Sequence, residues 1–173
     1  MSARTFEAGS DGWCRHRLLA LGVDIGDLVE AAGGFLCDRA RAGWDVTVVA
    51  TDGVTSRSLA ILGVATGAVT DDIVTAVREL APGGAVAVAP DLLLRNARLR
   101  HELARLAGDG SVEILVWGSE LGPGFDPVGH PVSAAARAFK SHALTAAGRM
   151  SGDGHTETLY RVRPAALRRL RAV

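Results

Sequence analysis

The sequence predicts an α/β protein with a doubly wound, mostly parallel sheet, that is, a Rossmann-like three-layer sandwich. Short runs of apolar and β-branched residues alternate with helical patterns of about 10–15 residues, as in repeated βαβ units. The clearest runs, residues 45–51, 85–89 and 112–117, are apolar almost throughout. Strands have this character when helices cover both faces of their sheet, and right-handed crossovers then wind the chain to both sides.

The first half of the chain is expected to contribute two strands and two helices. In order, the pattern predicts a flexible arm at 1–14, a short buried strand at 18–23, a helix capped by Asp24 and ended by Gly43, a strand at 45–51 and a helix at 71–80. Residues 59–64 are too short an apolar run to be assigned to a helix or a strand.

The second half continues the alternation. It predicts a strand at 85–89, a helix at 96–107, a strand at 112–117, a Gly/Pro-rich loop at 121–131, a helix at 132–147, a C-terminal edge strand at 156–162 and a short basic helix after Pro164. We expect one α/β domain at 15–163, followed by a basic tail at 164–173.

A pair of glycines interrupts the first predicted helix. Gly33 and Gly34 lie in its middle, where each glycine costs about 1 kcal/mol relative to alanine. Glycine at such a position leaves room for a neighbour at the helix surface. The pair therefore predicts that another segment approaches this helix closely.

The charge of the chain is zero but unevenly distributed. The 173 residues include 19 Lys and Arg, 19 Asp and Glu, and 48% hydrophobic residues, which excludes an intrinsically disordered protein and a globally basic nucleic-acid binder. Residues 1–130 carry 11 basic and 17 acidic side chains, and residues 131–173 carry 8 and 2, so the charge is −6 and then +6. This polarity predicts either an intramolecular cover or self-association, or contact with another protein partner.

The cysteines and the N-terminal residues favour a cytoplasmic protein. Cys14 and Cys37 do not form a CxxC pair, so we expect reduced thiols. The apolar run near the N-terminus is too short for a secretory leader or a membrane span.

Five polar residues follow the ends of predicted strands and form the candidate ligand-binding site. In open α/β sheets ligands bind beyond the carboxyl ends of the strands. The residues placed there are Asp52, Asp91, Ser119, Glu120 and His130. Acids and a histidine on one rim could act as general acid and base, but Asp and Ser after strands also serve ordinary turns and helix caps.

Several specific motifs are absent from the sequence. It lacks the phosphate-binding G-x-x-x-x-G-K-[ST] and G-x-G-x-x-G patterns, the nucleophile elbow G-x-S-x-G, and the spacing of a structural zinc site. We therefore expect no cofactor and no bound metal.

Residues 33–53, GGFLCDRARAGWDVTVVATDG, resemble the start of the PIG-L/LmbE family of zinc-dependent N-acetylglucosamine deacetylases. In that family a Gly-Gly helix runs into a strand that ends in Thr-Asp-Gly, and the metal motif Pro-His-Pro-Asp-Asp-Glu precedes the glycines. Here that stretch reads Val-Asp-Ile-Gly-Asp-Leu at 23–28, and the later His-Pro-Asp-His motif is missing too. The resemblance implies a relative that lost its metal, so no catalytic residue is carried over.

These observations lead to one expected function and two alternatives. We expect a non-catalytic α/β domain that binds a small ligand or a protein partner at the strand ends. The alternative is a hydrolase or transferase whose site at the strand ends consists of Asp52, Asp91, Ser119, Glu120 and His130. Nucleic-acid binding through the basic tail is a third hypothesis, disfavoured because no aromatic residues lie among the arginines.

Overall fold

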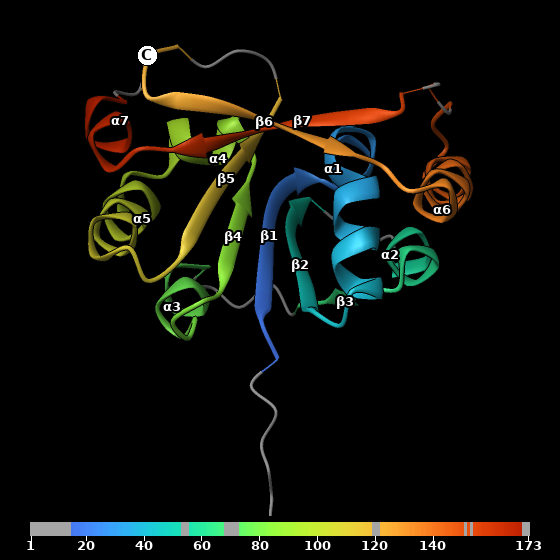
Figure 1. Ribbon diagram of the computed structural model, residues 1–173, viewed down its shortest axis with the longest axis horizontal. Coiled ribbons are helices and arrows are strands. Elements are labelled where there is room, and N and C mark those ends of the chain that lie inside the picture. Colours follow the sequence, from blue (N-terminus) through green and yellow to red (C-terminus); the bar gives the residue numbers. More distant parts are fainter. Residues whose placement is uncertain are drawn as a thin grey trace, which may run out of the picture.

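A computed structural model of the protein describes residues 15–52, 56–67, 73–118, 122–150, 152 and 154–170, with Asp52 and Ser56 described through their backbone only. It contains a seven-stranded sheet in the order β3-β2-β1-β4-β5-β7-β6 (Figure 1). The strands are β1 (Arg17–Asp24), β2 (Asp45–Asp52), β3 (Ala65–Thr66), β4 (Ala85–Val88), β5 (Glu113–Trp117), β6 (Phe125–Pro131) and β7 (Thr156–Val162). The first five are parallel, and β7 and β6 are antiparallel to their neighbours. The predicted α/β fold is confirmed.

Helices cover both faces of the sheet, as Figure 1 shows. On one side lie α1 (Ile25–Arg41), α2 (Ser56–Leu62) and α6 (Ala134–Ala146), and on the other α3 (Ile73–Arg78), α4 (Pro90–Arg95), α5 (Ala97–Asp109) and α7 (Pro164–Arg169). No described helix is long and apolar enough to cross a membrane. The expected arm at 1–14 lies outside the described residues.

The central strand β1 determines where the chain reverses direction across the sheet. β1 pairs with β2 on one side and with β4 on the other, and its residues Leu18–Leu21 are buried. The chain winds outward first through β2 and β3 and later through β4 and β5. The strand order therefore reverses between β1 and β4, where ligands of doubly wound sheets bind beyond the carboxyl ends.

The predicted loop at 121–131 is wrong for residues 125–131, because they form β6, at the edge of the sheet. The amide of Val132 donates to the carbonyl of His155, so even-numbered amides of this segment face β7 and odd-numbered ones face outward. Pro127 and Pro131 are odd-numbered. Proline has no amide hydrogen to donate, and an edge strand does not need one on its outer side. The predicted strand at 156–162 is present as β7, but the expectation that it lies at the edge is wrong, because it pairs with β5 on one side and β6 on the other.

Two short helices were not assigned from the sequence. The ambiguous residues 59–64 belong mostly to α2, and Pro90, directly after the predicted strand at 85–89, begins α4. Proline is favoured at the start of a helix because its missing amide hydrogen would have no partner there. The predicted helix at 71–80 is present as α3, and its first two residues lie outside the described chain.

The predicted close approach to the glycine pair is confirmed at Gly34. A Cβ atom added there would lie 2.5 Å from Cγ1 of Val132, 2.8 Å from Cγ2 of the same residue and 3.0 Å from Oε1 of Glu157. At Gly33 the nearest atom would be Cγ1 of Val29, at 3.2 Å. Gly34 therefore allows the segment before α6 and the start of β7 to pack directly on the backbone of α1.

We expect Gly34→Ala to lower the free energy of unfolding by about 1–3 kcal/mol, the usual cost of overpacking a tight interior. Gly33→Ala is the matched control, because its added methyl group meets a looser neighbourhood and gains helix propensity. Urea denaturation of both variants measures the difference. An equal loss at both positions would contradict the close packing at Gly34.

Candidate active site

Three acidic side chains at the start of α1 converge on one arginine. The guanidinium of Arg149 lies 2.6 Å from Asp27, 3.1 Å from Asp24 and 3.3 Å from Glu30, measured between nitrogen and carboxylate oxygen atoms. The acids are three residues apart, so they share one face of the helix. We call these four residues the arginine–carboxylate cluster.

Local structure places both sides of this cluster. Asp24 ends β1 and caps α1, because its Oδ1 accepts a hydrogen bond from the amide of Asp27 at 2.9 Å. Beyond α6, Gly148 adopts a left-handed conformation with φ +70°, and the amide of Arg149 donates to the carbonyl of Leu144. This C-terminal turn directs the chain of α6 back toward the start of α1.

The cluster lies where the fold predicts a ligand site. Asp24 is the last residue of the central strand β1, beside the reversal of strand order. In the parallel register it is the partner of Asp52, the last residue of β2. The hydrogen bond that Arg149 donates to Asp27 and the charges of Asp27, Asp24 and Glu30 raise the pKa of Arg149 above its ordinary value. Arg149 is therefore a permanent cation at this edge of the sheet.

A pocket of about 300 Å³ adjoins the cluster and shares Glu30 with it. It opens between α1, α6, β7 and the end of β5. Its polar and small lining residues include Glu30, Gly118, Lys140, Thr156, Glu157 and Thr158. We call it the strand-end pocket.

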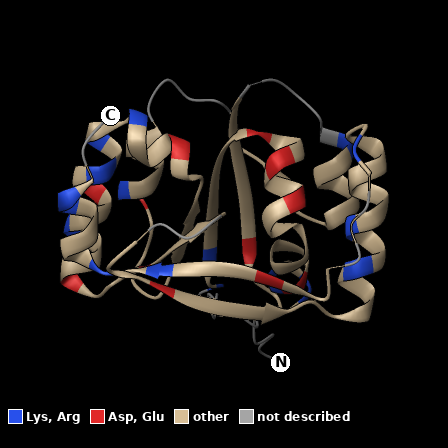
Figure 2. Cartoon of the chain, turned by 90° about the horizontal axis from the view of Figure 1, so that it is seen from above, with Lys and Arg blue, Asp and Glu red and all other residues tan. Residues whose placement is uncertain are grey.

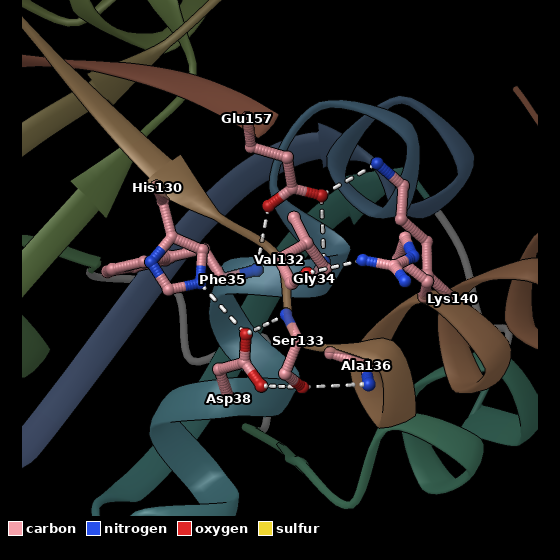
Figure 3. A network of polar contacts seen from close by, with 10 residues as sticks. Gly34, Phe35, Asp38, His130, Val132, Ser133, Ala136, Lys140 and Glu157 are labelled. Atoms are coloured by element: carbon pink, nitrogen blue, oxygen red, sulfur yellow. Dashed lines mark hydrogen bonds and ion pairs between the residues drawn. The ribbon is translucent and has the colours of Figure 1, made fainter. Parts of the chain in front are cut away.

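A buried ion pair forms one wall of this pocket (Figure 3). Oε1 of Glu157 accepts from Nζ of Lys140 at 2.6 Å and from the amide of Gly34 at 2.8 Å, and Oε2 accepts from the amide of Phe35 at 2.7 Å. Lys140 also donates to the carbonyl of Glu30, the acceptor that an uninterrupted helix offers to Gly34. The pair thus binds three main-chain groups in the middle of α1.

His130 belongs to a separate group of residues farther along α1. Its Nε2 lies 3.0 Å from Oδ2 of Asp38, and the hydroxyl of Ser133 donates to Oδ1 of the same carboxylate at 2.5 Å (Figure 3). In a hydrolytic triad the histidine connects serine and aspartate, whereas here the aspartate is in the middle. Asp38 follows Asp24 by 14 helical residues, roughly 21 Å along the axis, so His130 is distant from the strand ends.

The structure places the other predicted site residues as follows. Asp52 is at the carboxyl end of β2, and Asp91 is exposed in the first turn of α4, directly after β4. Ser119 and Glu120 lie outside the described residues. The set of five stays a prediction. The sequence pattern identifies Asp24 only as a helix cap and does not single out Arg149, whose pairing with Asp24 spans 125 positions of the chain.

The donor atoms of the cluster do not fit a zinc ion such as the one used by the family that residues 33–53 resemble. Each carboxylate is already paired with Arg149, and zinc in proteins favours histidine and cysteine ligands in addition to carboxylates. Across the described residues no group of three or more His, Cys, Asp and Glu side chains could hold a metal ion. Cys37 is buried, and burial raises the pKa of its thiol, as do the charges of neighbouring acids, so a thiolate ligand is disfavoured there.

Comparison with known proteins finds similar solved structures. No protein-family model and no curated protein matches the sequence. A deacetylase–teicoplanin complex from teicoplanin biosynthesis superposes with a TM-score of 0.59 at 16% identity, over 85% of this chain and 98% of that one. The A40926 pseudoaglycone deacetylase gives 0.58 at 16%, over 86% and 97%, and a zinc-inhibited form of teicoplanin deacetylase gives 0.58 at 15%, over 84% and 97%.

These matches correct the expected function. The chain shares its α/β fold with deacetylases, and a non-catalytic binding domain is the wrong expectation for that set of neighbours. The alternative of a hydrolase fits the comparison better. Residues 33–53 resemble a deacetylase family, and the similar solved structures support that resemblance at the level of the fold.

The Asp38 group predicts a pH-dependent contribution to stability. Burial raises the pKa of the Asp38 carboxyl, but hydrogen bonds from Ser133 and His130 outweigh it, so the pKa is lower than its ordinary value. A carboxyl with a lowered folded-state pKa stabilises the fold above its unfolded pKa of about 3.9, and this contribution is lost as the pH falls through the folded pKa.

We expect Asp38→Asn to lower the free energy of unfolding by about 1–3 kcal/mol at pH 7, and the deficit to shrink below about pH 4. Ser133→Ala removes the hydroxyl donor and should weaken the same pH dependence. Urea denaturation between pH 3 and about pH 7 measures both effects. A deficit that stays constant across this range would contradict the assignment.

Proposed function

We propose that the protein is a hydrolase that removes an acyl group from an amine, with its active centre at the arginine–carboxylate cluster and its substrate in the strand-end pocket. The observation that carries this proposal is the convergence of Asp24, Asp27, Glu30 and Arg149 beside that pocket. The deacetylases that share the fold support the reaction class.

Glu30 is the general base in this proposal. Arg149 pairs with its Oε2, and Oε1 has no hydrogen-bond partner among the described residues. Glu30 is also the residue common to the cluster and the pocket. Its carboxylate takes a proton from a water molecule whose oxygen attacks the acyl carbon, and it returns that proton to the leaving amine as the C–N bond breaks.

Arg149 stabilises the negative charge that develops on the acyl oxygen. Its guanidinium carries several N–H donors and a charge that does not depend on pH, which suits an oxygen atom that becomes negative in the transition state. Asp24 and Asp27 hold Arg149 in place and are positioning residues. This mechanism uses only side chains of the chain itself.

The size of the pocket indicates the substrate class. About 300 Å³ is at the lower end of the range for small-molecule sites and suits one sugar-sized group. Thr156, Thr158 and the Lys140–Glu157 pair provide hydroxyl and charged groups that suit a polar, hydroxylated ligand. We therefore propose an N-acylated amino sugar, free or as part of a larger glycoside.

We expect the wild-type protein to release acetate from N-acetylated amino sugars, and Glu30→Gln to lower this rate by about 10²–10⁴-fold, the usual contribution of a general base. Acetate release is measured with and without added zinc, because one neighbouring deacetylase is described in a zinc-inhibited form. Glu79→Gln, at an exposed acid after α3, is the matched control and should keep wild-type activity.

Two results would overturn the proposal. One is a wild-type protein that releases no acetate above the buffer rate from N-acetylglucosamine or its glycosides under either condition. The other is a Glu30→Gln variant as active as the Glu79→Gln control.

A further inference from the structure

Arg149 and the acids of α1 occupy the stretch that corresponds to the metal motif of the resembling family. Aligned on the Gly-Gly pair, Asp24 is at the histidine of Pro-His-Pro-Asp-Asp-Glu, Gly26 at its first aspartate and Asp27 at its second. Of the motif's three acids, one is retained as Asp27 and two are lost, at Gly26 and Leu28, and the motif's histidine is an acid here. The side chain of Arg149 lies among the residues that remain.

Gly26 provides independent evidence that the guanidinium occupies space next to the position of the motif's first aspartate. A Cβ atom added at Gly26 would lie 2.9 Å from Nε of Arg149, 3.2 Å from its Nη2 and 3.0 Å from Oδ1 of Asp24. Contacts this short require atoms to move. An aspartate at this position, as the motif has, would therefore shift the guanidinium from the place that it occupies beside Asp24.

We propose that Arg149 takes the place of the motif's metal ion, so that the strand-end carboxylates are neutralised by a cation covalently attached to the chain and not by an exchangeable one. Three carboxylates within 2.6–3.3 Å of a single guanidinium would otherwise repel one another. A divalent ion entering the same site would meet a positive charge that no pH in the working range removes.

This inference has one consequence for occupancy and one for turnover. The wild-type chain should bind no zinc at the cluster, and removal of the guanidinium should free its three carboxylates to rearrange around a divalent cation. Any hydrolysis by the wild-type chain should be insensitive to chelators, and only this second consequence rests on the proposed function.

The test measures zinc binding by isothermal titration calorimetry and by the shift in melting temperature. We expect no detectable zinc binding by the wild type. Arg149→Met should bind zinc with an affinity at least roughly tenfold above the weakest that the titration detects, because a like charge next to the ion has been removed. Arg137→Met is the matched control. Arg137 is on α6, the helix that precedes Arg149, and its guanidinium donates to the carbonyl of Val132 and not to an acid among the described residues.

Gly26→Asp provides a second variant. In the wild-type background we expect it to lower the melting temperature, and in the Arg149→Met background we expect it to tighten zinc binding further, a non-additive pair of effects. Circular dichroism establishes that each variant is folded.

The proposal is overturned if the wild type binds one zinc ion and Asp27→Asn abolishes that binding. It is also overturned if folded Arg149→Met binds zinc no better than Arg137→Met. These results are independent of the acetate assay, so an inactive protein with the expected zinc behaviour would refute the proposed hydrolase alone.

Discussion

The carboxylate of Glu157 holds together the side of the molecule on which the candidate site lies. It binds two main-chain amides in the middle of α1 and the ammonium group of Lys140 on α6, and it belongs to β7. The side chains of Glu157 and Lys140 are 4% and 16% exposed. Removing one partner of such a pair leaves a buried charge, which typically costs about 3–5 kcal/mol. The position of α6, and with it Arg149, depends on this contact.

The sequence predicts the core of this fold well and the site poorly, for one physical reason. Apolar strands such as β4 and β5, and the cap and spacing of α1, are local patterns that are visible within a few residues. The cluster at Arg149 is formed by residues more than 100 positions apart, and no local pattern encodes their meeting. Gly34 was the exception, because a glycine in a helix signals a neighbour without identifying it. β6 was missed because its prolines are typical of loops.

Some of the opposite charges of the two parts of the chain pair within the molecule. Arg149 pairs with the acids of α1, Arg161 with Glu113 and Arg163 with Asp126. Figure 2 shows acidic residues along α1, and basic ones over α6 and over α5 and α7 on the opposite side. These pairs are those of an intramolecular cover, one of the arrangements that the charge polarity predicts. They also bring the basic part of the chain to the candidate site.

The outward-facing prolines of β6 have a consequence for association. The exposed edge of a sheet can recruit a strand from another chain, and such pairing leads to aggregation or to open-ended assemblies. Pro127 and Pro131 remove two of the donors that an incoming strand would need, and the opposite edge, β3, is only two residues long. Both ends of the sheet are therefore poor templates for further strands. We expect any self-association of this protein to use its helices and not to extend its sheet.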